Sequence, residues 1–179
     1  MTDCRTGSDC SGSVVVDVLR SALAGAPLGA VESVVRLPVR VVVYGQPAPQ
    51  GSKRHVGGGR MIESSKAVKP WREAVKYAAR LVIEREGIKA PLDGPLLARV
   101  VVTVPKPKSA PKRRRTWPDR KPDLSKLLRS TEDALTDAGL IADDARLVEF
   151  SRLAKVFPGE DPEALESPGC VITVEPVKA

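Results

Sequence analysis

The residues best suited to chemistry are carboxylates that stand close to a dense run of basic residues. Asp123 precedes an amphipathic segment of the chain, and Asp143 and Asp144 follow that segment. Carboxylate oxygens are ligands that Mg²⁺ prefers, and such an ion activates water and stabilises the charge on a phosphodiester that is being cleaved. Acids of this kind beside a basic, phosphate-attracting surface point to a metal-dependent nuclease.

Each of these acids also has a purely structural interpretation. Asp is a favoured N-cap residue, so Asp123 taken alone is typical of a helix start. Adjacent Asp residues at a turn, such as Asp143 and Asp144, are commonly solvated turn formers. A helix of about 16 residues would separate the two places by roughly 24 Å. Only a chain that returns along the helix, or a second subunit, would bring Asp123 near Asp144.

Residues 105–122 are rich in Pro, Lys and Arg and contain a single acid, Asp119, so this segment alone carries a charge equal to the +7 of the whole chain. Clustered Lys and Arg attract phosphates whatever the base sequence, and Trp117 offers a surface on which a base can stack. We therefore expect this segment to contact nucleic acid. The alternatives are a solvated loop or an acidic protein partner. The basic residues are Lys106, Lys108, Lys112, Arg113, Arg114, Arg115, Arg120 and Lys121.

The composition excludes several kinds of chemistry. A single histidine, His55, rules out sites that need two imidazoles. Cys4, Cys10 and Cys170 form an odd set without metal-ligand spacing, which indicates reduced thiols of a cytoplasmic protein. No apolar run approaches the roughly 18 residues of a membrane span. Apolar residues make up 42% of the chain and aromatic residues only 3%, so we expect a core that is mainly aliphatic.

Alternation and helical spacing predict the elements that position these residues. They favour an α/β (α+β) fold with a small mixed sheet of about four strands covered by two helices. We expect an N-terminal extension at residues 1–37 and one domain at 38–179. The predicted strands are 39–44, 96–104, 145–157 and 170–175, the predicted helices are 70–86 and 124–138, and residues 45–60 are predicted to be a loop.

The segment 122–144 resembles the signature of the RusA-type Holliday junction resolvases, a family of crossover junction endodeoxyribonucleases. The resemblance rests on PDLSKLLR at 122–129, EDALTDAGL at 132–140 and the closing pair DD at 143–144. The segment GQPAPQGSKR at 45–54 and the pair WR at 71–72 also resemble this family. The resemblance covers about residues 39–175. It implies a RusA-like fold, a homodimer, and Mg²⁺-dependent cleavage of four-way DNA junctions by paired symmetric nicks, with Mn²⁺ as a possible substitute.

The resemblance also implies roles for individual residues. The implied catalytic residues are Asp123, Asp144 and Arg129. The implied metal ligands are Asp123, Asp133, Asp143 and Asp144. We expect the DNA-binding residues to be Lys53, Arg54, Lys112, Arg113, Arg114, Arg115, Arg120, Lys121 and Lys126.

The chain departs from the family pattern at three positions. Ser125 stands where the pattern has its second acid, Lys126 where it has Asn, and Arg129 where it has Lys. The missing carboxylate should weaken metal affinity, and Glu132 and Asp133 on the same helical face are candidates to supply the charge. Arg129 can stabilise a phosphate but cannot donate a proton as a lysine does.

Two other functions stay open. Ser125 together with the intact basic segment is compatible with a protein that binds branched DNA and is catalytically weak or inactive. The positive charge also permits an RNA-binding or ribosome-associated protein, in which the acidic signature would have no role.

Overall fold

The computed structural model describes residues 38–51, 53–55, 61–63, 65–111 and 113–178, and the predicted extension at 1–37 lies outside these residues. Over the described part of the chain, no helix combines the length and the apolar character needed to cross a membrane. The elements in chain order are β1 (Val39–Tyr44), β2 (Lys53–His55), β3 (Met61–Glu63), α1 (Val68–Glu86), β4 (Leu96–Thr103), α2 (Leu124–Ala138), η1 (Asp144–Arg146), β5 (Leu147–Val156) and β6 (Gly169–Pro176).

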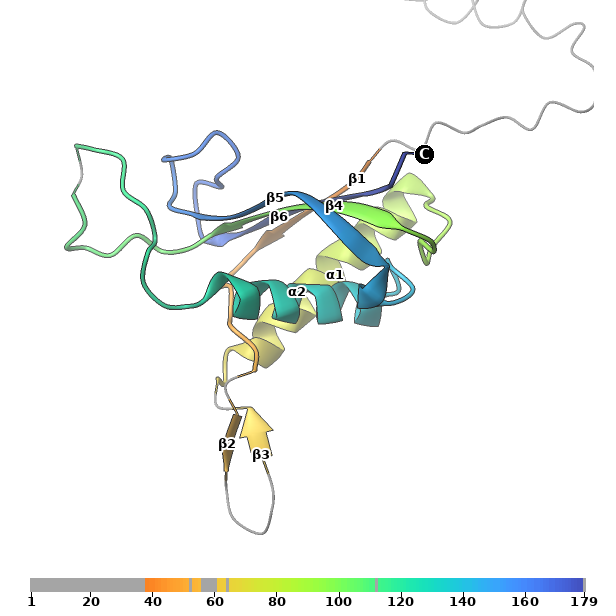
Figure 1. Cartoon of the computed structure of the whole chain (residues 1–179), viewed down its shortest axis with the longest axis horizontal. Helices are drawn as coiled ribbons and strands as arrows, with labels where there is room; N and C mark the ends of the chain where they lie inside the picture. Colours follow the sequence, from red (N-terminus) through yellow and green to blue (C-terminus); the bar gives the residue numbers. More distant parts are fainter. Residues whose placement is uncertain (1–37, 52, 56–60, 64, 112, 179) are drawn as a thin grey trace, which may run out of the picture. The chain divides into compact units, whose positions relative to one another are not determined.

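The main sheet has four strands in the order β1-β6-β4-β5, and β2 and β3 form a separate hairpin. Strand β6 pairs antiparallel with β1 and with β4, whereas β4 and β5 are parallel. Parallel neighbours require a crossover connection, and here it consists of residues 105–122, α2 and η1. Figure 1 shows α1 and α2 on one side of the sheet. The predicted fold class is confirmed.

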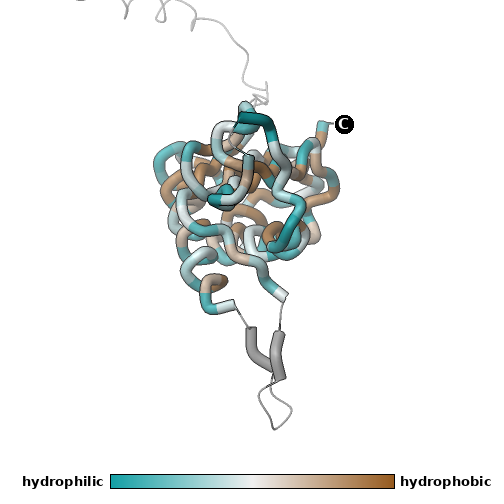
Figure 2. The backbone as a smooth tube through the Cα atoms, turned by 90° about the vertical axis from the view of Figure 1, so that its left-hand side faces the viewer, coloured by the Kyte–Doolittle hydropathy of each residue, from teal (hydrophilic) through white to brown (hydrophobic). Residues whose placement is uncertain are grey.

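The core lies between the sheet and the two helices and is mainly aliphatic, as predicted. Figure 2 shows the apolar segments gathered in its interior. Trp71 on α1 is the large exception, with 2% of its surface exposed, and its indole N–H donates to Thr131 Oγ1 on α2 at 3.4 Å. Cys170 is a buried free thiol whose pKa is raised by burial. Its assignment as a reduced thiol is compatible with this apolar setting.

The structure differs from the sequence-based elements at three places. Strand β2 lies within the predicted loop at 45–60, and β3, with which it forms a hairpin, directly follows that loop. Neither strand was predicted, because three-residue strands are too short to show an alternating pattern. Helix α1 begins at Val68, so Pro70 lies in its first turn, where a missing N–H costs nothing. Strand β5 is preceded by the short 3₁₀ turn η1.

Candidate functional site

Asp123 occupies the N-cap position of α2 but does not use its carboxylate as a cap. Its backbone is extended (φ −69°, ψ 137°), and the side chain makes no capping hydrogen bond. The Oδ2 atom lies 3.4 Å from Nζ of Lys126, and 49% of the side chain is exposed. Asp123 therefore stands at the N-cap position, as its structural interpretation predicts, but its carboxylate does not cap the helix and can face a ligand.

Lys155 on β5 holds the chain that enters α2. Its Nζ donates to the carbonyl oxygens of Arg120 and Pro122, both at 2.7 Å. Burial lowers the pKa of Lys155, and the charges of Asp123 and Asp119 oppose this shift. The sequence alone left open whether Lys155 reaches the site. The signal for it was a lysine in register with the buried Val102 of β4, at a position where an apolar side chain is expected.

A groove of about 390 Å³ opens beside Asp123. Residues 46–49, which follow β1, form its opposite wall. This wall is fixed to α2, because the buried Ser130 Oγ donates to the carbonyl oxygen of Ala48 at 2.7 Å. The carboxylate of Asp123 therefore lines a defined concave surface.

Asp133 lies in a polar network that joins α2 to α1 and to the segment after β1. Arg72 Nη1 lies 3.2 Å from Asp133 Oδ2 and 3.1 Å from Gln50 Oε1, and Arg72 Nη2 lies 2.5 Å from Asp137 Oδ2. Gln50 Nε2 also donates to Asp133 Oδ2, and the Gln50 N–H donates to the carbonyl oxygen of Lys126 at 2.9 Å. One carboxylate oxygen of Asp133 is thus shared by two donors of the chain, and its role as a metal ligand stays a prediction.

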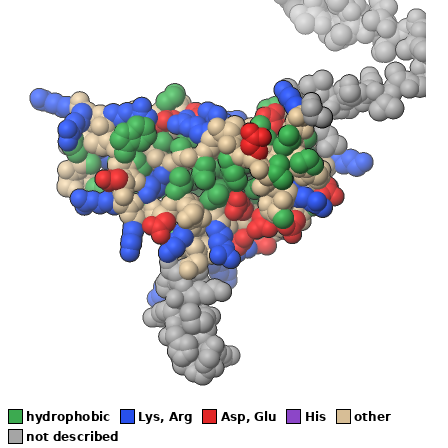
Figure 3. Space-filling view, in the orientation of Figure 1, with side chains coloured by type: hydrophobic (Ala, Val, Ile, Leu, Met, Phe, Trp, Pro, Cys, Tyr) green, Lys and Arg blue, Asp and Glu red, His purple; other side chains and the backbone are tan. Residues whose placement is uncertain are grey.

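The second acidic position lies where the chain returns along α2. Asp143 Oδ1 accepts from the Ala145 N–H at 2.9 Å and caps η1, whereas Asp144 is exposed. Burial raises the pKa of Glu132 on α2, and the negative charge of Asp144 adds to this shift. Asp144 therefore lies near the second half of α2, and Glu132 is roughly 13 Å along the helix axis from Asp123. Figure 3 shows acidic side chains gathered over this end of α2.

The donor set can be tested against a divalent ion. The described ranges contain no group of three or more His, Cys, Asp or Glu side chains placed to hold a metal ion. Ser125, which stands where the resembled pattern has an acid, is exposed. Mg²⁺, however, commonly binds through one or two carboxylates and completes its shell with waters and substrate phosphates. The exposed carboxylate of Asp123 suits an open site of this kind, but Asp144 lies near Glu132, roughly 13 Å along α2 from Asp123. The fold of one chain therefore does not bring these two predicted ligands together.

Acids of the loop between β5 and β6 hold the basic segment 105–122. Other cations of the segment have no carboxylate partner among the described residues. Lys106 forms an ion pair with Glu160, and Arg115 Nη2 lies 3.4 Å from Asp161 Oδ2. Figure 3 shows Lys and Arg side chains gathered over the end of the molecule that carries this segment. Five further cations of the segment form no ion pair with any carboxylate of the described residues: Lys108, Arg113, Arg114, Arg120 and Lys121.

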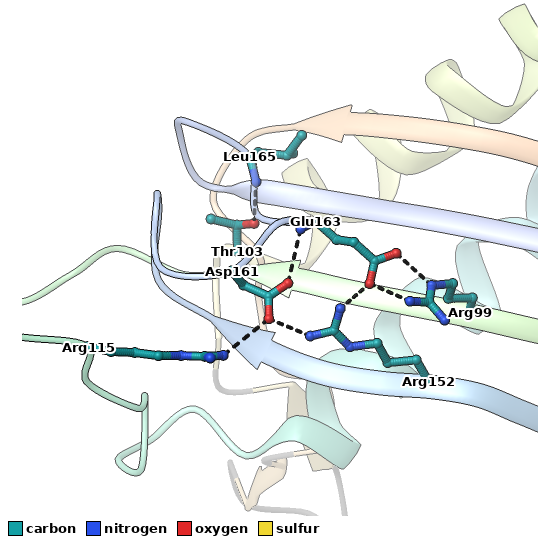
Figure 4. A network of polar contacts seen from close by, with 7 residues as sticks. All are labelled: Arg99, Thr103, Arg115, Arg152, Asp161, Glu163 and Leu165. Atoms are coloured by element: carbon teal, nitrogen blue, oxygen red, sulfur yellow. Dashed lines mark hydrogen bonds and ion pairs between the residues drawn. The ribbon is translucent and has the colours of Figure 1, made fainter.

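The acids that hold the basic segment are anchored on the sheet (Figure 4). Asp161, whose side chain is 3% exposed, lies 2.5 Å from Arg152 Nη2 on β5. Glu163 accepts from Arg99 Nε and Nη2, both at 2.6 Å, and pairs with Arg152. The hydrogen bond from Arg152 lowers the pKa of Asp161. The loop between β5 and β6 is therefore tied to the sheet by these ion pairs, and Asp161 in turn contacts Arg115.

The β2–β3 hairpin leaves the domain next to Arg129. Gly51 has φ +100°, a backbone conformation that residues other than glycine rarely adopt. A Cβ atom at this position would lie 3.9 Å from Arg129 Nη1. The predicted DNA-binding residue Lys112 lies outside the described residues, as do the side chains of Lys53 and Arg54.

The sequence model of a protein family described as Endodeoxyribonuclease RusA matches residues 44–174. No curated protein matches the chain. The matched span contains every residue that the sequence analysis assigned to catalysis, metal binding or DNA binding.

Proposed function

The chain belongs to the RusA endodeoxyribonuclease family, and from this premise we propose that it resolves four-way DNA junctions by paired symmetric nicks. The observation that carries the proposal is Asp123, a carboxylate at a helix start that makes no capping bond and opens into a groove beside the basic segment. We assign this activity to residues 38–179 and treat residues 1–37 as an extension.

DNA binding would rest on the cations that the fold leaves without acidic partners. Phosphate attraction needs clustered Lys and Arg, and the segment 105–122 presents them on a loop that is anchored by Glu160 and Asp161. Lys121 also lines the groove of Asp123. A DNA strand bound along the segment would therefore pass the carboxylate of Asp123.

The catalytic roles divide between α2 and the turn that follows it. Asp123 and the Asp143–Asp144 pair lie toward opposite ends of α2, so a second subunit would be needed to bring them to one ion. Together they would hold Mg²⁺ or Mn²⁺, and the bound ion would supply positive charge and a more acidic water. Arg129 and Lys126 would neutralise the charge that develops on the phosphate. Lys155 would keep Asp123 in place through the carbonyl oxygens that precede it.

A homodimer would present two copies of this site. A four-way junction has two-fold symmetry, so two symmetric sites would place one nick in each of two opposed strands. Sedimentation of the full chain with and without junction DNA tests this, and a protein that stays monomeric in both cases would contradict the paired-nick model.

A second candidate function is a branched-DNA-binding protein with little or no cleavage. It is favoured by Ser125, which leaves the start of α2 with one carboxylate fewer than the family pattern, and by the absence of a three-acid group among the described residues. This candidate keeps the basic segment and its affinity for DNA but loses the metal-dependent reaction.

The test uses a labelled four-way junction and a linear duplex of matching sequence, each incubated with Mg²⁺, Mn²⁺ or EDTA. We expect symmetric nicks confined to the junction and dependent on the divalent ion. Asp123→Asn and Asp144→Asn should each abolish cleavage and leave junction binding intact. Glu84→Gln, a change at an exposed acid on α1, is the matched control and should cleave normally.

The other outcomes separate the candidates. Junction-selective binding without nicks in any metal would support the binding protein and contradict the resolvase. Full activity of Asp123→Asn would overturn the assignment of the site, and equal affinity for junction and duplex without cleavage would overturn both candidates.

A further inference from the structure

A cavity of about 740 Å³ lies under the basic segment. Its floor includes Val104 and Phe157, the buried residues that directly follow β4 and β5. Prolines of the segment and Trp117 line it together with charged residues: Arg114, Arg115, Asp119, Arg120 and Lys121. Apolar and polar residues thus share the lining, which suits a ligand with both a planar apolar part and hydrogen-bonding or charged groups. The surrounding cations select an anionic one.

Trp117 is placed as a stacking surface rather than as a core residue. Its side chain is 62% exposed, whereas Trp71, the other tryptophan of the chain, is 2% exposed. The guanidinium carbon of Arg115 lies over the ring of Trp117, 4.1 Å from its centroid. Because the guanidinium covers one face, the high exposure means that the opposite face is open to a planar ligand.

The two residues that precede Trp117, Arg115 and Thr116, are held by acids of the loop between β5 and β6 before any ligand binds. The Thr116 N–H donates to Glu160 Oε2 at 3.1 Å, and the Thr116 hydroxyl lies 3.1 Å from the same atom. Arg115 is held by Asp161 (Figure 4). A ring that is already oriented loses little conformational freedom on binding, so the cavity is preorganised.

The cavity adjoins the groove of Asp123. Gln46, Lys121 and Pro122 line both spaces. A phosphate beside Asp123 would therefore have its neighbouring nucleotide at the entrance of the cavity. The base stack of a duplex is interrupted at the branch point of a junction, and displacing a base costs less where its stacking is already interrupted.

We propose that this space, the loop cavity, binds a nucleobase displaced from the DNA strand at the branch point and stacks it on Trp117. The inference rests on the proposed function for its substrate, but it requires base recognition and not cleavage. It adds a base contact to a protein that otherwise contacts phosphates.

The first test compares oligothymidylate with an abasic strand of equal length, which carries the same phosphates and no bases. Each is titrated into the full chain while tryptophan emission and binding anisotropy are recorded. Stacking on an aromatic ring contributes about 1–3 kcal/mol per base, so oligothymidylate should bind about tenfold more tightly. It should also quench the emission, and the abasic strand should not.

Variants connect this preference to the cavity. Trp117→Ala should lose the preference for the strand with bases, and Trp117→Phe should retain part of it because a ring is still present. Tyr77→Ala removes an equally exposed aromatic side chain on α1 and should keep the full preference. Circular dichroism of each variant checks that the fold is intact.

Equal affinity for the two strands, or an unchanged preference in Trp117→Ala, would overturn the loop cavity as a base site. The cleavage assay described above separates this result from the proposed function. Junction cleavage without base preference overturns only the cavity, whereas base preference without junction cleavage overturns only the resolvase and leaves the cavity supported.

Discussion

Asp123 and Ser125 define how much negative charge the start of α2 can offer to a cation. Ser125→Asp would add a carboxylate two residues after Asp123, in the first helical turn, where the helix dipole also favours an acid. We expect about tenfold tighter binding of Mn²⁺, measured by calorimetry without DNA, because a further hard oxygen ligand joins the site. Ser167→Asp, at an exposed position outside α2, is the control. Unchanged Mn²⁺ affinity of Ser125→Asp would contradict a metal site at this helix start.

Substitution of Lys155 should lower both the free energy of unfolding and the affinity for DNA. Lys155→Met keeps the apolar stem but leaves the carbonyl oxygens of Arg120 and Pro122 without their donor. Each unsatisfied group costs roughly 1–3 kcal/mol when shielded from water, so we expect a loss of about 2 kcal/mol in urea unfolding. Junction affinity should also fall, since the end of the basic segment is released. Wild-type stability of this variant would show that the two hydrogen bonds contribute nothing net.

The ion pair of Asp161 should make the stability of the fold depend on pH in the acid range. The hydrogen bond from Arg152 lowers the pKa of Asp161 below its ordinary value of 3.8. Since the folded-state pKa is the lower one, the interaction stabilises the fold fully above that ordinary value and is lost as the pH falls through the folded-state pKa. Asp161→Asn should therefore lower the urea midpoint at about pH 7 and much less at about pH 2.5. An equal effect at both pH values would rule out the charged pair as the cause.

At the scale of elements, the contact between β6 and β1 depends on a residue without a side chain. A Cβ atom on Gly169 would lie 2.2 Å from the carbonyl oxygen of Val43, a distance that real Cβ atoms essentially never show. Gly169→Ala should therefore separate the two strands and destabilise the fold by about 3 kcal/mol. Urea unfolding measures this, with Ser167→Ala as the control. A loss under about 0.5 kcal/mol would mean that the strands adjust freely.

The regular elements were predictable because their patterns are long. The apolar spacing of 124–138 and the left-handed Gly139 after it identify α2, and the buried run at 96–103 identifies β4. The β2–β3 hairpin was not predictable, because its strands are too short to carry a period.

The candidate site was predictable only in part. The positions of Asp123 and the basic segment follow from the sequence, but the missing cap bond of Asp123 does not. Neither do the contacts of Asp133 with Arg72 and Gln50, because these join residues far apart in the chain. The sequence left open whether Lys155 reaches the site, because a charged residue in a strand normally faces solvent, whereas this one reaches backbone carbonyls.

At the scale of the whole molecule, the net charge of +7 should appear as a strong dependence of DNA binding on salt. Five cations of the segment 105–122 without described acidic partners predict a slope of log K against log salt of about −4 to −5 on duplex DNA. The double variant Arg113→Ala with Arg114→Ala should reduce the slope by about 2. Lys89→Ala with Lys178→Ala, at exposed positions elsewhere, should leave it unchanged. A slope unaffected by the arginine pair would place the DNA on another surface.

The crossover between β4 and β5 contains nearly all the residues that would act on DNA, while β1, β4 and β6 contribute none of them. The residues proposed to act on DNA therefore lie mainly in one continuous stretch of chain, and the strands that form the sheet lie outside it. In such an arrangement, substitutions in the crossover need not disturb the packing of the sheet. The length, the charge and the catalytic residues of the crossover can change while the strands keep the sequence that forms the sheet. Ser125, which stands where the resembled family pattern has an acid, lies in this crossover and outside the strands of the sheet.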